Sequence, residues 1–128
     1  MLEKITTDLK TSKKLKELGF DSSESEFVYW EGKPYYYDTL PFYEINKIDD
    51  LITCYTVEQI INELPEYYQS RSGYNSYLTY EKTNHTFYYQ EKSNTPNKYK
   101  NIIISAGSDN LATTAAKLWI KLKEDEII

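Results

Sequence analysis

Alternating side chains over residues 77–91 constrain the fold of this chain more than any other feature. If Thr83-Asn84 forms a two-residue turn, Tyr80 faces Phe87 across an antiparallel hairpin. One face of the hairpin then collects its larger apolar and aromatic side chains, which are Leu78, Tyr80, Phe87 and Tyr89. The opposite face receives a half-polar set, which consists of Tyr77, Thr79, Glu81, Thr86, Tyr88 and Gln90. A shift of one residue would mix the two sets, so the pattern predicts both an antiparallel sheet and its register.

Two helices are predicted in the first half of the chain. The first runs from about Asp8 to Leu18, and Gly19 is suited to the left-handed residue that ends many helices. The second begins after Thr56, a good N-cap, and ends before Pro65. Its apolar residues recur at helical spacing, at Val57, Ile60, Ile61 and Leu64.

A third helix is predicted at the C-terminal end, beginning after Gly107 with Ser108 or Asp109 as its cap. Its apolar stripe consists of Leu111, Ala115, Leu118 and Leu122. Lysines in its second half suit the negative end of the helix dipole. Residues 101–105 before it read as a short strand or an extended lead-in.

Further strands are predicted between the first two helices. Phe27–Trp30 and Tyr35–Tyr37 flank a turn signal at Glu31-Gly32-Lys33-Pro34, and two more segments are candidates at Phe42–Ile45 and Leu51–Cys54. We therefore expect a single α+β domain over residues 1–128. Its sheet should be mostly antiparallel, with about three helices, in the order α-β-β-β-α-β-β-α.

Bulk composition fits one folded domain in a reducing compartment. The 128 residues are 40% hydrophobic and 27% charged, which is ordinary for a globular chain. One cysteine, Cys54, allows no intrachain disulfide. The N-terminus lacks the pattern of a signal peptide, and no apolar stretch approaches the roughly 20 residues needed to span a bilayer. We expect a cytoplasmic protein that does not enter a membrane.

Charge is segregated along the chain. Residues 21–66 hold 11 of the 20 acidic side chains and only two lysines, a formal charge of −9, whereas the whole chain carries −5. The same stretch contains six of the 14 tyrosines. A surface that mixes carboxylates with phenols complements a basic surface on another protein, because opposite fields select the partner and aromatic side chains anchor it. The alternative is that these acids only keep the domain in solution.

Enzymatic chemistry finds little support in the residues. Cys54 and His85 are the sole cysteine and histidine, and the predicted strand and turn hold them apart, so no nucleophile–base pair is expected. Two such ligands cannot fill the four positions of a structural metal site, and the acidic loops lack the spacing of a calcium loop. The four glycines are isolated, so there is no phosphate loop. We expect neither an enzyme nor a cofactor or metal.

Binding of single-stranded nucleic acid is an alternative function. Tyr77 and Tyr88 could stack on bases, with charge supplied by Lys10, Lys13, Lys14, Lys98 and Lys100. Against this stands the net charge of −5 and a single arginine, Arg71. Phosphate neutralisation supplies most of the affinity for nucleic acid, which makes a basic protein partner the better prediction.

Several segments resemble a group of small phage and prophage proteins. These segments are Leu15–Phe20, Tyr29-Trp30, Thr56–Pro65, Asp109–Ala112 and Ala115–Trp119. The resemblance implies an accessory role in infection, and some small acidic phage proteins block host defence nucleases by binding them. It carries over no catalytic or binding residue.

The sequence thus leads to one functional hypothesis with two alternatives. The hypothesis is a non-enzymatic, anti-CRISPR-like inhibitor that binds a host defence factor, such as an RNA-guided nuclease, through its acidic, tyrosine-rich region. The residues predicted to contact the partner are Asp21, Glu24, Glu26, Glu31, Tyr35, Tyr37, Asp38, Glu44, Asp49 and Asp50. The alternatives are a single-strand nucleic-acid binder and a structural or assembly component of a virion.

Overall fold

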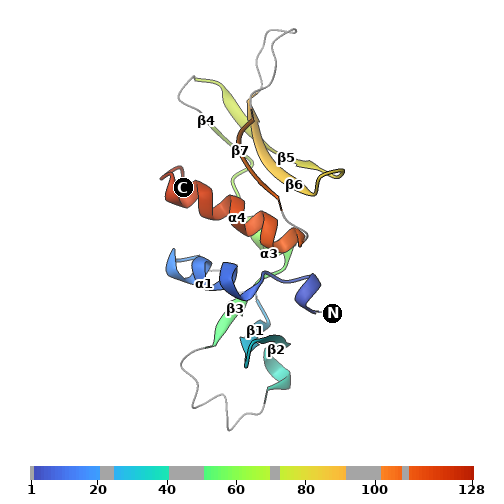
Figure 1. The fold of residues 1–128 in the computed structure, drawn as a ribbon. Coiled ribbons are helices and arrows are strands. Elements are labelled where there is room, and N and C mark those ends of the chain that lie inside the picture. The colour runs from blue at the N-terminus through green and yellow to red at the C-terminus, as the bar shows by residue number, and fades with distance from the viewer. Residues whose placement is uncertain (1, 21–24, 41–50, 70–72, 92–101, 108–109) are drawn as a thin grey trace.

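Two antiparallel sheets lie at opposite ends of the molecule, and the helices fill the space between them (Figure 1). The computed structural model describes residues 2–20, 25–40, 51–69, 73–91, 102–107 and 110–128, and only the backbone at 3 and 102–106. The helical elements are η1 (Leu2–Lys4), α1 (Leu9–Glu17), η2 (Tyr37–Thr39), α3 (Val57–Glu63) and α4 (Leu111–Glu124). The strands are β1 (Phe27–Trp30), β2 (Lys33–Tyr36), β3 (Ile52–Cys54), β4 (Tyr67–Gln69), β5 (Asn75–Glu81), β6 (Thr86–Glu91) and β7 (Ile102–Gly107). The predicted α+β class is confirmed, but the strands form two sheets, and four strands rather than two lie between α3 and α4.

The four-stranded sheet has the order β4-β5-β6-β7 and contains the predicted hairpin in the predicted register. Leu78 pairs with Tyr89 and Tyr80 pairs with Phe87. Phe87 and Tyr89 are buried against α4, whereas Tyr80, near the turn, remains 40% exposed. The turn is longer than predicted, since the paired strands end four residues apart and His85 adopts a left-handed φ of 47°.

Helix α1 begins and ends as its sequence predicts. The Asp8 side chain caps the helix by accepting a hydrogen bond from the Thr11 N–H at 2.7 Å. At the other end Gly19 has a φ of +83°, which places it in the left-handed region. Its N–H donates to the Lys16 carbonyl, and the Phe20 N–H donates to the Leu15 carbonyl. These two bonds form a complete Schellman motif, which turns Phe20 into the core.

The other two helices are also confirmed, with one corrected cap. Thr56 and Gln59 form a reciprocal capping box at the start of α3. The cap of α4 is Asn110, whose side chain accepts from the Thr113 N–H at 3.1 Å, so the prediction of Ser108 or Asp109 as the cap was wrong. Asn110 also reaches across the fold, and its Nδ2 donates to the Thr6 carbonyl at 2.8 Å.

The three-stranded sheet has the order β2-β1-β3 and lies at the other end of the molecule. Its first hairpin turns at Glu31 and Gly32, both at positive φ (52° and 81°), which is the geometry of a type I′ turn. β3 confirms the strand predicted near Leu51–Cys54, whereas the strand predicted over Phe42–Ile45 lies outside the described residues. The two open interpretations of residues 101–105 resolve to a strand, β7.

A buried polar network joins the N-terminal segment to both halves of the fold. The Thr7 hydroxyl accepts from the Tyr55 N–H at 3.1 Å and shares a 2.7 Å hydrogen bond with the Ser12 hydroxyl. The Tyr29 hydroxyl, from β1, donates to the Thr7 carbonyl at 3.0 Å. The main apolar core lies on the other side of this network, between α1, α3, α4 and the four-stranded sheet. The three-stranded sheet is thus joined to the helices by this network and by the packing of β3, where Cys54 is buried, on α1.

Candidate functional site

The structure describes half of the residues that were predicted to contact a partner. Asp21, Glu24, Glu44, Asp49 and Asp50 lie outside the described residues. The remaining five belong to the segment that enters β1, the β1–β2 hairpin and η2, and they are Glu26, Glu31, Tyr35, Tyr37 and Asp38.

Three of these five side chains come from one end of the hairpin. The register of β1 and β2 pairs Phe27 with Tyr36, which brings Glu26 next to Tyr37. A hydrogen bond of 2.7 Å from the Tyr37 N–H to the Glu26 carbonyl fixes this contact. Asp38 follows directly in η2. We call Glu26, Tyr37 and Asp38 the acidic tyrosine patch, whereas Tyr36 lies on the other sheet face, with its ring 4.8 Å from that of Phe27.

The patch is open to solvent. Tyr37 is 46% exposed, and Glu26 and Asp38 are also exposed. Neither carboxylate forms an ion pair with any described residue. Exposed phenol rings beside unpaired carboxylates can contribute anchoring area and charge to an interface together.

The other two predicted residues lie elsewhere on the hairpin. Glu31 occupies the turn at the far end of β1, roughly 16 Å from Glu26 along a strand that rises about 3.3 Å per residue. Tyr35 pairs with Val28, and it is only half-exposed because its ring packs edge-on against Trp30 at a centroid distance of 5.7 Å. Sequence proximity therefore predicted a single surface, whereas the length of β1 separates Glu31 from the patch and the contact with Trp30 partly covers Tyr35.

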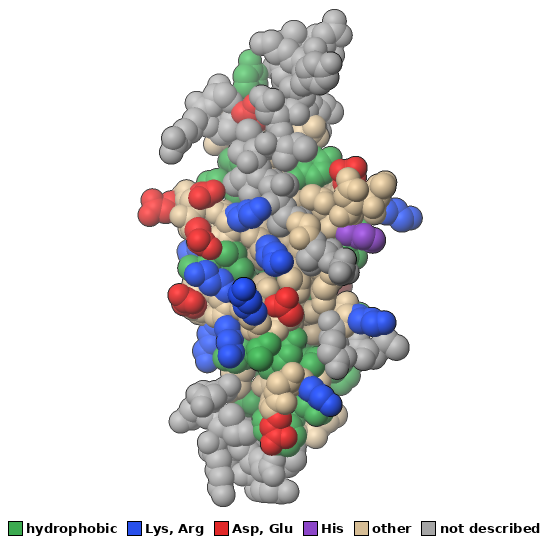
Figure 2. Space-filling view, in the orientation of Figure 1, with side chains coloured by type: hydrophobic (Ala, Val, Ile, Leu, Met, Phe, Trp, Pro, Cys, Tyr) green, Lys and Arg blue, Asp and Glu red, His purple; other side chains and the backbone are tan. Residues whose placement is uncertain are grey.

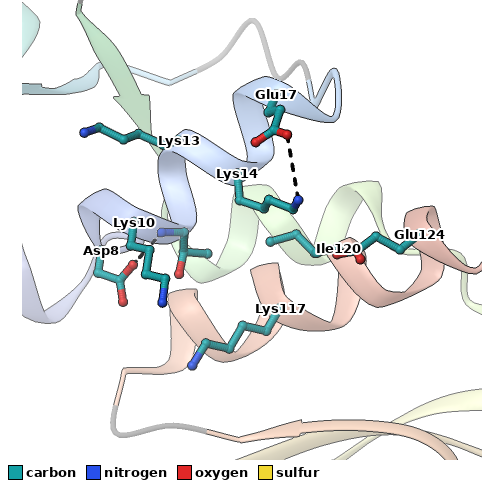
Figure 3. A pocket seen from close by; sticks show the side chains of 9 residues that line it. Asp8, Lys10, Lys13, Lys14, Glu17, Lys117, Ile120 and Glu124 are labelled. Atoms are coloured by element: carbon teal, nitrogen blue, oxygen red, sulfur yellow. Dashed lines mark hydrogen bonds and ion pairs between the residues drawn. The ribbon is translucent and has the colours of Figure 1, made fainter.

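The described lysines gather on a different part of the molecule, over α1 and α4 (Figure 2). Between these two helices lies a groove of about 590 Å³, which we call the α1/α4 groove. Its lining consists of Asp8, Lys10, Thr11, Lys13, Lys14, Glu17, Lys117, Ile120 and Glu124 (Figure 3). The sequence placed Lys10, Lys13 and Lys14 together on one helix surface, but it gave no sign that Lys117 lies across from them.

A catalytic pairing of cysteine and histidine is absent from the described residues. Cys54 is fully buried in β3, and burial raises the pKa of its thiol to about 11, so the reactive thiolate is disfavoured at neutral pH. His85 is exposed in the β5–β6 turn of the other sheet, where its Nδ1 lies 3.3 Å from the Tyr80 hydroxyl. The prediction that Cys54 acts as a small buried apolar residue is confirmed. Among the described residues no group of three His, Cys, Asp or Glu side chains could hold a metal ion.

The outer face of the four-stranded sheet carries a second set of tyrosines. Tyr77 and Tyr88 lie on this face and are half-buried, as predicted. Tyr67 of β4 joins them, with 54% of its surface exposed and its ring 5.6 Å from that of Tyr77. Sequence reasoning missed Tyr67, although the Tyr67-Tyr68 pair after Pro65 was a signal for a short strand. Helix α4 packs on the inner face of this sheet and lies between it and α1, so the tyrosines face away from the lysine-rich helices.

Comparisons of the chain with protein-family models, curated proteins and solved structures give no match. Within the described ranges, no helix has the length and apolar character to cross a membrane.

Proposed function

We propose that this chain is a non-enzymatic binding protein that docks onto a basic surface of a protein partner. The observation that carries the proposal is the acidic tyrosine patch, where Glu26 and Asp38 have no ion-pair partner among the described residues and lie beside the half-exposed Tyr37. Unpaired carboxylates retain their full field for a partner, which speeds association and disfavours acidic surfaces. The Tyr37 ring supplies contact area with little loss of side-chain entropy.

The resemblance to small phage and prophage proteins suggests which partner to test first. A host defence factor that binds nucleic acid, such as an RNA-guided nuclease, has a basic channel that an acidic surface complements. In this proposal the protein acts in the cytoplasm of a bacterial host and blocks that channel by occupying it.

A charge-reversal pair tests the docking role of the patch. Glu26→Lys/Asp38→Lys reverses two patch carboxylates, and Glu63→Lys/Glu66→Lys reverses two exposed carboxylates outside the patch with the same change in net charge. Both variants and the wild type would be measured by surface plasmon resonance against candidate defence nucleases at two salt concentrations. We expect wild-type association to slow as salt rises. The patch variant should lose at least tenfold in affinity, whereas the control variant should stay within about threefold.

Two results would refute the proposal. Equal loss of affinity in both variants would mean that net charge alone governs binding, and full retention of affinity in the patch variant would show that the patch is not part of the interface.

An infection assay checks the biological role. Phage should infect a defended host that expresses the wild type or the control variant, and fail in one that expresses the patch variant.

Single-strand nucleic-acid binding is less well supported by the geometry. The tyrosines of the outer sheet face and the lysines of α1 lie on different sides of α4, so a short strand cannot stack on the first while its phosphates contact the second.

A further inference from the structure

The α1/α4 groove combines a cationic end with a mixed end. At one end Lys10 from α1 and Lys117 from α4 point toward the same space (Figure 3). At the other end the Lys14 Nζ lies 3.9 Å from the Glu17 Oε1, and Glu124 also lines this end. The two ends therefore differ in charge, and a ligand that fits them must also differ along its length.

The walls of the groove are fixed by hydrogen bonds between segments that are distant in sequence. The Asp8 N–H donates to the Thr113 hydroxyl at 3.0 Å, and Asn110 reaches the Thr6 carbonyl. These bonds tie the start of α1 to the first turn of α4. Lys10 and Lys117 are thus placed on a preorganised frame, which lowers the entropy that binding must overcome.

The cations at this end lack internal partners. Lys10 and Lys117 make no ion pair with any described residue, whereas Lys13 points away from them (Figure 3). The nearby Asp8 carboxylate is engaged as the helix cap, where its Oδ1 accepts from the Thr11 N–H at 2.7 Å. Ammonium groups that gather without counter-charges repel one another, and an anion between them removes that repulsion.

We propose that the α1/α4 groove binds a small phosphorylated ligand of nucleotide size, with its phosphates at the Lys10 and Lys117 end. Lysine is a common partner of phosphate because its three rotating N–H donors adapt to several oxygens. The volume of about 590 Å³ falls within the range of small-molecule sites. At the mixed end, Glu17 and Glu124 can accept hydrogen bonds from hydroxyl groups, and the Ile120 side chain offers an apolar contact. This site is separate from the acidic tyrosine patch and does not depend on its function.

Isothermal titration calorimetry of the full chain tests the proposal, with inorganic tripolyphosphate and ATP as probes, each without divalent metal. Both should bind, and a rise in salt should weaken both. Lys10→Ala/Lys117→Ala should lower each affinity at least tenfold. The matched control Lys33→Ala/Lys82→Ala removes two exposed lysines, one at the start of β2 and one in the β5–β6 turn, with the same change in net charge, and should stay within about twofold. Thermal melts by circular dichroism verify that each variant is folded.

A further variant tests the sign of the groove charges. Glu124→Gln removes a carboxylate from the lining and should raise the affinity for tripolyphosphate by about two- to fivefold.

Binding of tripolyphosphate and ATP with equal affinity would identify a phosphate site, and tighter binding of ATP would add contacts to the nucleoside; both support the proposal. It is overturned if neither probe binds or if the control loses as much affinity as the groove variant. Salt-sensitive self-association that the groove variant abolishes, without binding of either probe, would also overturn it, because the acidic surface of a second copy would then fill the groove.

Discussion

Gly19 ends α1 in a setting that isolates the cost of backbone conformation from that of side-chain packing. Its φ is +83°, and a Cβ added there would meet nothing within 4 Å. Gly19→Ala therefore introduces no steric conflict with neighbouring residues. An L-residue in the left-handed region costs about 1–2 kcal/mol, and the lower entropy of alanine in the unfolded chain offsets about 0.5–1 kcal/mol of this. The expected net loss in unfolding free energy is about 1 kcal/mol.

Thermal and urea unfolding followed by circular dichroism would measure this loss. For a chain of 128 residues, 1 kcal/mol corresponds to a fall in Tm of roughly 3–6 °C. Gly19→Asn is the matched variant, because asparagine tolerates the left-handed region better than alanine, and it should recover part of the loss. If Gly19→Ala melts within 1 °C of the wild type, or if the asparagine variant is as unstable as the alanine variant, the reasoning is refuted.

Three further predictions follow from the same structure. Glu126 follows α4 at a φ of 58° in a second Schellman motif, a position that favours glycine. Glu126→Gly should therefore raise the unfolding free energy, measured in urea melts, by about 0.5–1 kcal/mol. The increase should be smaller for Glu126→Gln, which removes only the charge. Tyr29→Phe deletes the hydrogen bond to the Thr7 carbonyl and should cost about 1 kcal/mol by the same measurement. Burial raises the pKa of the Cys54 thiol from 9.0 to about 11, so the thiol of the unfolded chain ionises first as pH rises. The unfolding free energy of the wild type should therefore fall between pH 9 and 11, by up to about 2–3 kcal/mol relative to that of Cys54→Ala. A difference between the two proteins that does not change with pH would contradict this.

Local signals allowed most of the elements to be predicted. The register of the 77–91 hairpin follows from side-chain alternation, and the ends of α1 and α3 follow from Gly19 and Thr56, because each signal acts within a few residues of its effect. β4 could not be predicted in this way. Its three residues do alternate in burial, but the Tyr67-Tyr68 pair is too short a signal to stand alone, and the segment is a strand because Tyr67 and its neighbours pair with β5. The cap of α4 was misplaced by one or two residues for a related reason, since Asn110 is selected in part by its contact with Thr6.

The same distinction between local and long-range effects applies to the candidate sites. Glu26 and Asp38 could be brought together from the sequence, because a hairpin with a short turn places residues before and after it side by side. Glu31 was grouped with them on sequence distance alone, although a strand separates them in space. The α1/α4 groove lay beyond sequence reasoning, since Lys10 and Lys117 meet only through the packing of two helices that no local pattern specifies.

The bond between the Asp8 N–H and the Thr113 hydroxyl spans 105 positions of the chain. At a synthesis rate of about 5–20 residues per second, roughly 5–20 s therefore pass between the synthesis of Asp8 and that of Thr113. Contacts of such long range are expected to form late in folding. Helix α1 can therefore complete its packing only after α4 has been synthesised.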